Sequence, residues 1–324
     1  MKRQLLNLSF LLFSITAQAQ VNPGYSESVK KAIALYEAQQ YQQSADAFTH
    51  AFAVNDGKGY PDDRYNAACS WALAGNKDSA FYQLERIATR AGYKDYNHMN
   101  IDADLASLHT DSRWTEICAL VRKNKEKAEA GLNMPLVAIL DTVMQDDQAG
   151  RVKELQLEKK YGYDSKEVRD AWKTIKYADS VDLIKVEAIL ARYGWPGADE
   201  IGDDGNTTLF LVIQHSDIKV QEKYLPVMRD AVKNKKANSA DLALLEDRVA
   251  LREGRKQIYG SQVHGSPDGK YWVSPLEDPD NVDKRRAEVG LPPIADYLAQ
   301  WNIKWDVETY KKELPDIEKK EKIR

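Results

Sequence analysis

Two consecutive segments near the N-terminus repeat one helical arrangement. In residues 27–53, apolar side chains recur at helical spacing, break off and then resume, which is the pattern of two amphipathic helices. Residues 63–91 repeat this pattern around a break at Gly75. Aligning Tyr41 with Lys77 offsets the two pairs by 36 residues, and helical pairs that repeat at such an interval stack on one another. The chain is therefore expected to begin with stacked helical hairpins.

The second of these pairs carries a recognisable pattern. Residues 65–81, YNAACSWALAGNKDSAF, resemble the tetratricopeptide units of exported bacterial proteins, and residues 102–108 and 111–114 resemble the segment that closes such a unit. The resemblance covers residues 26–124 and is weaker for the first unit, which lacks the expected Gly near Ala38. It implies a surface that binds a protein or peptide partner. Two units are fewer than an independent solenoid usually needs, so they are expected to lean on the closing helix or on a second domain.

A second domain is expected over residues 133–316. A charge run, a Gly and a Pro place the boundary near residues 124–135, with a helix that continues to Ala130 as an equal alternative. A loop is expected at residues 202–206, because it combines Gly, Asp and Asn. Apolar spacing and capping residues predict helices over 136–155, 166–192, 207–215, 220–235, 238–252, 280–289 and 293–301.

One β-hairpin interrupts the helical pattern of the second domain. Residues 257–263 and 270–274 are β-prone and flank the turn residues 266–269. The charged tail, residues 317–324, alternates in sign and is expected to be solvated. The predicted fold class is mainly α, with tetratricopeptide-like helical hairpins followed by a helical domain that carries one short β-hairpin near residues 257–274.

The second domain also resembles a bacterial domain family of unknown function, over residues 133–316. No single motif is specific, but their order is. The family more often has Thr where Ser261 stands. The resemblance implies a domain identity and no activity. The motifs are W-P-G at 195–197, Q-H-x-D at 214–217, D-R-V at 247–249, Q-x-Y-G-[ST]-Q at 257–262 and D-x-x-R at 283–286, followed by Gly290-Leu291.

The first residues predict export. Lys2 and Arg3 precede a short apolar run, and Ala17-Gln18-Ala19 is a signal-peptidase pattern. This order of segments is typical of a secretory signal peptide, residues 1–19. We expect cleavage after Ala19 and a periplasmic or secreted protein. No other stretch approaches the roughly 18 apolar residues of a membrane span, so none is expected.

The charge balance bears on nucleic-acid binding, and the cysteine content bears on disulfide formation. The chain has 46 basic and 50 acidic residues, and it has no basic block before its C-terminal tail, which argues against nucleic acid as a partner. Its two cysteines, Cys69 and Cys118, form no disulfide framework. A buried free thiol and a bridge between the two are both open. Nothing in the sequence indicates an oligomeric state.

The usual catalytic and metal-binding patterns are absent. The sequence contains no H-E-x-x-H, C-x-x-C, G-x-x-x-x-G-K-[ST] or G-x-S-x-G. We therefore assign no metal and no cofactor. His215, at the end of an apolar helix, could act as a general base or acid because its ordinary pKa lies near neutrality. The favoured alternative is a buried histidine that bonds a helix end or a carboxylate, because the sequence identifies no nucleophile or metal partner for it. The five histidines share no metal-ligand spacing: His50, His98, His109, His215 and His264.

Several polar residues of the second domain are expected to converge. Arg248 flanks an apolar stripe and needs a nearby acceptor, and the hairpin beginning at Gln257 must fold back onto the same helices. A convergent polar cluster is either a ligand site or a network that holds the fold. The candidate ligand-binding residues are Gln214, His215, Asp247, Arg248, Gln257, Tyr259 and Gln262.

Three functions are compatible with these patterns. The first is an exported interaction or binding protein with a tetratricopeptide-like protein-binding surface. The second is a module whose polar motifs are purely structural. The third is a hydrolase in which His215 acts as general base on a water molecule, because no nucleophile is identifiable.

Overall fold

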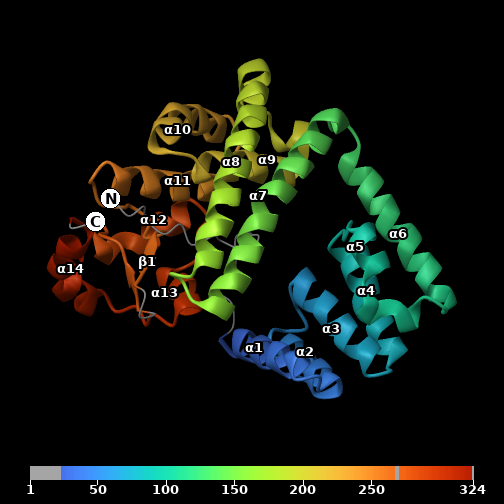
Figure 1. The fold of residues 1–324 in the computed structure, drawn as a ribbon. Helices are drawn as coiled ribbons and strands as arrows, with labels where there is room; N and C mark the ends of the chain where they lie inside the picture. The colour runs from blue at the N-terminus through green and yellow to red at the C-terminus, as the bar shows by residue number, and fades with distance from the viewer. Residues whose placement is uncertain (1–22, 267–269, 323–324) are drawn as a thin grey trace. The chain divides into compact units, whose positions relative to one another are not determined.

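The computed structural model describes residues 23–266 and 270–322, and its fold is mainly α with one short antiparallel hairpin (Figure 1). The predicted fold class is confirmed. The predicted signal peptide and most of the turn at 266–269 lie outside the described residues. The chain divides into two compact units between Ala130 and Gly131, called below the N-terminal unit and the C-terminal unit.

The N-terminal unit consists of helices, most of them antiparallel neighbours. Its first four helices form two hairpins, a pattern compatible with tetratricopeptide-like repeats. Polar side chains define several helix starts: Asn76 caps α4 by accepting from the amide of Ser79 at 3.0 Å. The elements are α1 (Pro23–Glu37), α2 (Tyr41–Val54), α3 (Pro61–Leu73), α4 (Lys77–Arg90), α5 (Tyr96–Ile101), the 3-10 helix η1 (Ala103–Leu108) and α6 (Ser112–Glu129).

Small residues let the helices of this unit cross closely. The Ser44 hydroxyl is buried between helices, donates to the Ala32 carbonyl at 2.8 Å and lies 3.0 Å from the Ser70 hydroxyl. The sequence left the state of the two cysteines open; Cys69 and Cys118 are both buried and free. Both thiols lie in one apolar core with Leu84, Ile87, Leu105 and Leu108.

The C-terminal unit contains a long antiparallel helical pair, α7 and α8 (Figure 1). No helix in the described part of the chain combines the length and the apolar character of a membrane span. The elements are α7 (Met134–Tyr161), α8 (Lys166–Tyr193), α9 (Ala198–His215), α10 (Ile218–Lys233), α11 (Ser239–Arg252), β1 (Val263–Gly265), β2 (Tyr271–Val273), the 3-10 helix η2 (Pro279–Asn281), α12 (Val282–Glu288), α13 (Ile294–Leu298), the 3-10 helix η3 (Ala299–Trp301) and α14 (Val307–Lys322).

Helix α9 is the central helix of this unit, and the predicted loop at residues 202–206 is wrong. The segment belongs to α9, which kinks at Gly202, where φ is 72°. Asn206 is buried and tethers the helix by donating to the carbonyl oxygens of Pro196 at 3.0 Å and Lys236 at 2.7 Å. Asn usually favours loops, but in this helix the Asn206 side chain supplies hydrogen bonds to buried backbone carbonyl groups.

The hairpin is shorter than predicted. Val263–Gly265 pairs antiparallel with Tyr271–Val273, with His264 opposite Trp272. Residues 257–262 form no strand and make only an isolated bridge between Gln257 and Leu276. The predicted strand over this segment is therefore wrong, because its backbone amides bond a carboxylate instead of a neighbouring strand.

The described residues of the charged tail, 317–322, belong to α14, and its side chains Lys319 and Lys320 are exposed. Ile317 is buried in a core with Tyr310. The Tyr310 hydroxyl accepts from the amide of Leu276 at 2.7 Å and donates to the carbonyl of Ser274 at 2.9 Å. Alternating charges conceal this helix in the sequence, because its apolar positions are seven residues apart and only one face is buried.

Candidate functional site

The seven candidate residues come from the end of α9, from α11 and from the segment that follows α11. They belong to two hydrogen-bond networks that adjoin at Asp247 and Arg248, which are neighbours on α11. The first network fastens residues 257–262 and is called the loop network. The second surrounds Gln214 and His215 and is called the α9-end network.

Asp247 is the centre of the loop network. It is fully buried, and its carboxylate accepts from the backbone amides of Ile258, Tyr259 and Ser261 at 2.6, 2.9 and 2.9 Å. Burial raises the pKa of Asp247, and the three amide bonds act in the opposite direction. The chain wraps around this carboxylate, which explains why these residues do not pair as a strand.

Gln257 and Gln262 close the same loop. The Gln257 side chain is fully buried, accepts from the Gln262 amide at 2.8 Å and donates to the Ser274 carbonyl at 2.9 Å. The Gln262 side chain donates to the Ser261 hydroxyl at 3.0 Å. Tyr259 takes part through its backbone. Gln257 and Tyr259 therefore fasten the loop to Ser274 and to Asp247.

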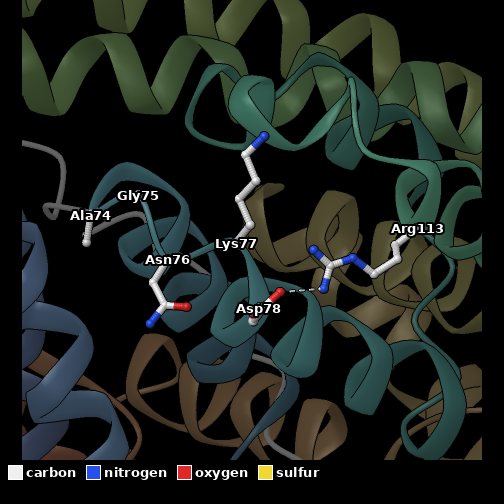
Figure 2. A pocket seen from close by; sticks show the side chains of 6 residues that line it. All are labelled: Ala74, Gly75, Asn76, Lys77, Asp78 and Arg113. Carbon is white, nitrogen blue, oxygen red and sulfur yellow. Dashed lines mark hydrogen bonds and ion pairs between the residues drawn. The ribbon is translucent and has the colours of Figure 1, made fainter.

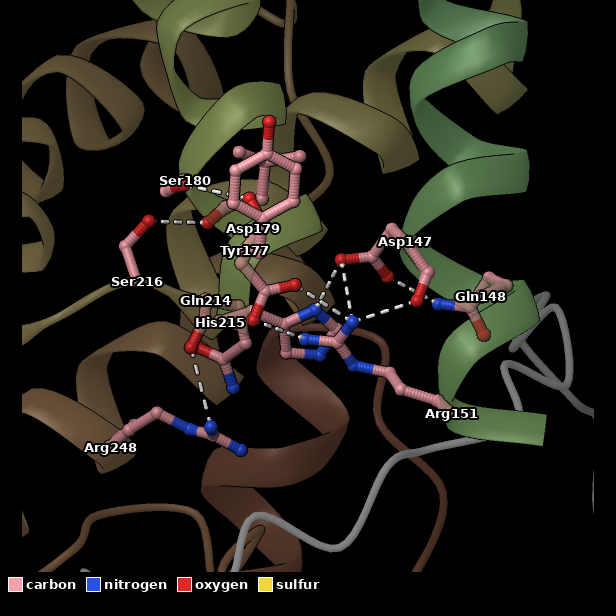
Figure 3. A network of polar contacts seen from close by, with 11 residues as sticks. Asp147, Gln148, Arg151, Tyr177, Asp179, Ser180, Gln214, His215, Ser216 and Arg248 are labelled. Carbon is pink, nitrogen blue, oxygen red and sulfur yellow. Dashed lines mark hydrogen bonds and ion pairs between the residues drawn. The ribbon is translucent and has the colours of Figure 1, made fainter. Parts of the chain in front are cut away.

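The α9-end network is built on a histidine–carboxylate pair (Figure 3). His215 Nδ1 lies 2.8 Å from Asp147 Oδ1. Arg151 donates to the Asp147 carbonyl at 2.7 Å and makes a forked contact with Asp179, at 2.9 and 3.1 Å. This network joins α7, α8 and α9.

The protonation of the pair follows from its surroundings. Burial lowers the pKa of His215, so the imidazole is neutral near pH 7. Burial acts to raise the pKa of Asp147, but the bond to His215 and the Arg151 charge hold it below its usual value. An ionised carboxylate only accepts hydrogen bonds, so Nδ1 carries the proton and Nε2 carries the lone pair.

Arg248 helps to cap the end of α9. Its Nη1 donates to the Gln214 carbonyl at 3.3 Å, and Gln221 donates to the same oxygen at 2.8 Å. Arg252 donates to the Ser216 carbonyl at 3.0 Å. These carbonyls lie where a helix leaves its acceptors without intrahelical partners, and cations are favoured there. Burial lowers the pKa of Arg248 to about 9, so it stays charged near neutrality.

Two polar groups of this network lack a hydrogen-bond partner among the described residues. The Gln214 side chain is 3 % exposed, and within residues 23–266 and 270–322 neither its oxygen nor its nitrogen has a hydrogen-bond partner. His215 Nε2 makes no hydrogen bond in the same part of the chain. The network offers a base next to a buried amide, but none of its side chains is a serine, threonine or cysteine nucleophile poised on Nε2.

Sequence reasoning missed Asp147, Arg151 and Asp179. A signal for the first two exists on α7, where Leu136, Leu140 and Val143 form the buried stripe and Asp147 and Arg151 continue it. Charged residues at apolar positions must be paired, so the position itself predicts a partner. The identity of that partner requires the tertiary fold.

Residues 137–307, more than half of the chain, match the model of a family described as "Family of unknown function (DUF6624)". The chain belongs to the DUF6624 family. The DUF6624 region includes all seven candidate residues and excludes the N-terminal unit, which matches no tetratricopeptide family. No curated protein and no solved structure matches the chain.

Outside the DUF6624 region, an open recess of about 490 Å³ lies at the turn between α3 and α4 (Figure 2). Arg113 donates to Asp78 at 2.7 Å across it, so the two charges offset each other. The side chain of Asn76 already caps α4. The recess is therefore a weak candidate for a specific site. Its lining residues are Ala74, Gly75, Asn76, Lys77, Asp78 and Arg113.

One cluster of possible metal ligands occurs in the N-terminal unit. Ligand atoms of Cys69, Asp102 and Asp104 lie within 4.8 Å of one another. Asp102 accepts from the Tyr65 hydroxyl at 2.8 Å and Asp104 accepts from the Tyr36 hydroxyl. Burial and the two carboxylates raise the pKa of the Cys69 thiol. These contacts favour a hydrogen-bonded polar cluster with a protonated Cys69 thiol, which holds η1 against α3.

Proposed function

We propose that this chain is an exported interaction protein, in which the buried motif residues hold the DUF6624 fold and the outer helical surface binds a partner protein. One observation carries the proposal: α8 exposes two large apolar side chains, Tyr177 and Ile184, on the side opposite its buried face. The N-terminal signal pattern supports export. The stacked hairpins of the N-terminal unit support a second, tetratricopeptide-like binding surface.

The buried face of α8 contains Val168, Ile175 and Val186. Tyr177 and Ile184 are 73 % and 69 % exposed. Ile184 is two residues from Val186, a rotation of about 200° around the helix, so it lies on the opposite side. Tyr177 and Ile184 are seven residues apart and share that side.

Exposed apolar side chains aligned along one helix face are characteristic of protein-binding surfaces. The buried polar motifs do not provide such a surface, because their atoms bond the chain itself. A helix of a partner that packs along Tyr177 and Ile184 would bury both side chains. At about 2 kcal/mol for each fully buried large side chain, the two would contribute substantially to binding.

Site-specific photo-crosslinking in cells that produce the protein tests this surface. A photoreactive residue is placed at Tyr177, at Ile184 or at Glu222, an exposed control position on α10. We expect one adduct of the same mass from positions 177 and 184, none from 222, and loss of the adduct at 184 when Tyr177→Glu is added. An adduct at twice the chain mass identifies a second copy as the partner. No adduct, or equal labelling at all three positions, contradicts the proposal.

A second candidate function has one specific observation in its favour. Asp147 orients His215 so that the Nε2 lone pair is free to accept a proton from water, which is the requirement for a general base. A water-attacking hydrolase would use this pair. Hydrolysis of p-nitrophenyl acetate above the buffer rate, lost in His215→Ala and reduced in Asp147→Asn, would support it. Equal rates for wild type and His215→Ala would exclude it for this ester.

A further inference from the structure

Two arginine side chains of the N-terminal unit converge on one backbone oxygen. Arg64 of α3 donates from Nη2 to the Gly57 carbonyl at 2.6 Å, and Arg86 of α4 donates from Nη2 to the same oxygen at 3.3 Å. Two positive groups that share one acceptor lie close together and repel each other. The arrangement concentrates positive charge beside the loop between α2 and α3.

Neighbouring side chains hold both guanidinium groups in place. Arg64 donates from Nη1 to the Gln83 side chain at 2.7 Å, and its guanidinium lies 4.3 Å from the centroid of the Phe52 ring. Arg86 donates to the Tyr82 hydroxyl at 3.1 Å. The Arg86 Nε is buried and has no hydrogen-bond partner among the described residues. The donors are thus oriented in advance, and one of them is unused.

No carboxylate within residues 23–266 and 270–322 forms an ion pair with Arg64, Arg86 or Arg90, which follows Arg86 by one helical turn. Burial lowers the pKa of Arg64, and the charges of Arg86 and Arg90 lower it further. Arg113 of the same unit is different, because it lies between Asp78 and Asp111. The charge of the arginine cluster is therefore left for an outside group to balance.

We propose that the Arg64–Arg86 cluster binds an oxyanion, the carboxylate or phosphate group of a ligand. Guanidinium groups match such groups with paired N–H donors. Arg86 and Arg90 are the accessible donors, and Arg64 supplies a fixed buried charge behind them. An anion here relieves the repulsion between the arginines.

Titration of the full chain at low ionic strength tests the site, with the arginine Nε–H signals followed by NMR. The probes are inorganic phosphate and, separately, succinate. We expect a saturable shift of the Arg86 signal with at least one probe, weakened by added salt because the charges are screened. Saturation with only one probe identifies which of the two chemical groups the site prefers.

Variants separate a site from general charge attraction. Arg86→Gln should weaken binding by about tenfold or more, since it removes a charge-assisted donor. Arg122→Gln is the matched control, because Arg122 also contacts a tyrosine, Tyr96, without a second arginine beside it; its affinity should be that of wild type. Where circular dichroism shows that Arg86→Gln does not fold, Arg90→Gln replaces it.

Two results would overturn the site: shifts that rise linearly without saturation for both anions, or equal affinities in wild type and in the folded Arg86→Gln or Arg90→Gln variant. The test involves neither Tyr177 nor Ile184. Its outcome is therefore independent of partner binding at α8.

Discussion

His215 Nδ1 lies 2.8 Å from Asp147 Oδ1, and this bond joins the end of α9 to the middle of α7 across 68 residues of sequence. Both side chains are almost fully buried. Because the bond couples the central helix to the long helical pair, its loss should lower the stability of the C-terminal unit.

Asp147→Ala should destabilise the C-terminal unit by about 3 kcal/mol, the scale for removing one partner from a buried charged network. The change leaves Arg151 with Asp179 alone and leaves His215 Nδ1 without an acceptor. Hydrogen exchange of α9 peptides, residues 198–215, measures the effect. Replacing the exposed Asp146 by Ala is the control and should change little. Protection in Asp147→Ala equal to that of wild type would contradict the role assigned to the pair.

Asp241 should make the protein less stable as pH rises. Burial raises its pKa to about 7, and it forms no hydrogen bond or ion pair with the described residues. The folded state therefore holds a proton that the unfolded state releases above its ordinary pKa of about 3.9. Its contribution to stability falls between about pH 4 and pH 7 and is constant above that. Asp241→Asn should flatten this part of a stability curve measured by urea unfolding; an unchanged slope would show that Asp241 titrates normally.

Gly260→Ala should be more destabilising than Gly254→Ala. Both glycines have positive φ, 69° and 76°, and a side chain there costs about 1–2 kcal/mol. At Gly260 an added Cβ would also lie 2.7 Å from Ile294 Cδ1, whereas at Gly254 it meets nothing within 4 Å. The difference between the two unfolding free energies isolates the contact. Equal losses would mean that Ile294 moves aside freely.

Tyr310→Phe should lower stability by about 1–3 kcal/mol, because it removes the donor and acceptor that serve Ser274 and Leu276 inside the core. Tyr271→Phe, at a position that is 37 % exposed, should change little. Thermal unfolding of the two variants compares them. If Tyr310→Phe unfolds at the same temperature as Tyr271→Phe, the Tyr310 hydroxyl does not fasten α14.

Helix positions in this chain can be predicted from local signals. Asn238 and Asp217 cap α11 and α10 through their side chains, and the apolar run of α9 is buried. Such signals act over a few residues, so they are visible in sequence. The membership of residues 202–206 in α9 depends instead on Asn206 bonding carbonyls that lie 10 and 30 residues away.

The destination of a buried polar side chain cannot be predicted in the same way. The sequence predicts that Arg248 and the segment beginning at Gln257 converge, but it does not predict that the Asp247 carboxylate accepts the backbone amides of residues 258, 259 and 261. This choice turns a β-prone segment into a loop. Ile184 is hydrophobic but exposed, whereas Asp182 is buried, because the fold determines which face of a helix is covered.

If the buried motif residues serve the fold, the free energy of unfolding must fall in Asp247→Ala. Removing this carboxylate leaves the amides of Ile258, Tyr259 and Ser261 unpaired. We expect a loss of about 3 kcal/mol, together with lost hydrogen-exchange protection over residues 257–262. Wild-type stability and protection in Asp247→Ala would contradict it, because a residue kept for a ligand can be removed without weakening the fold.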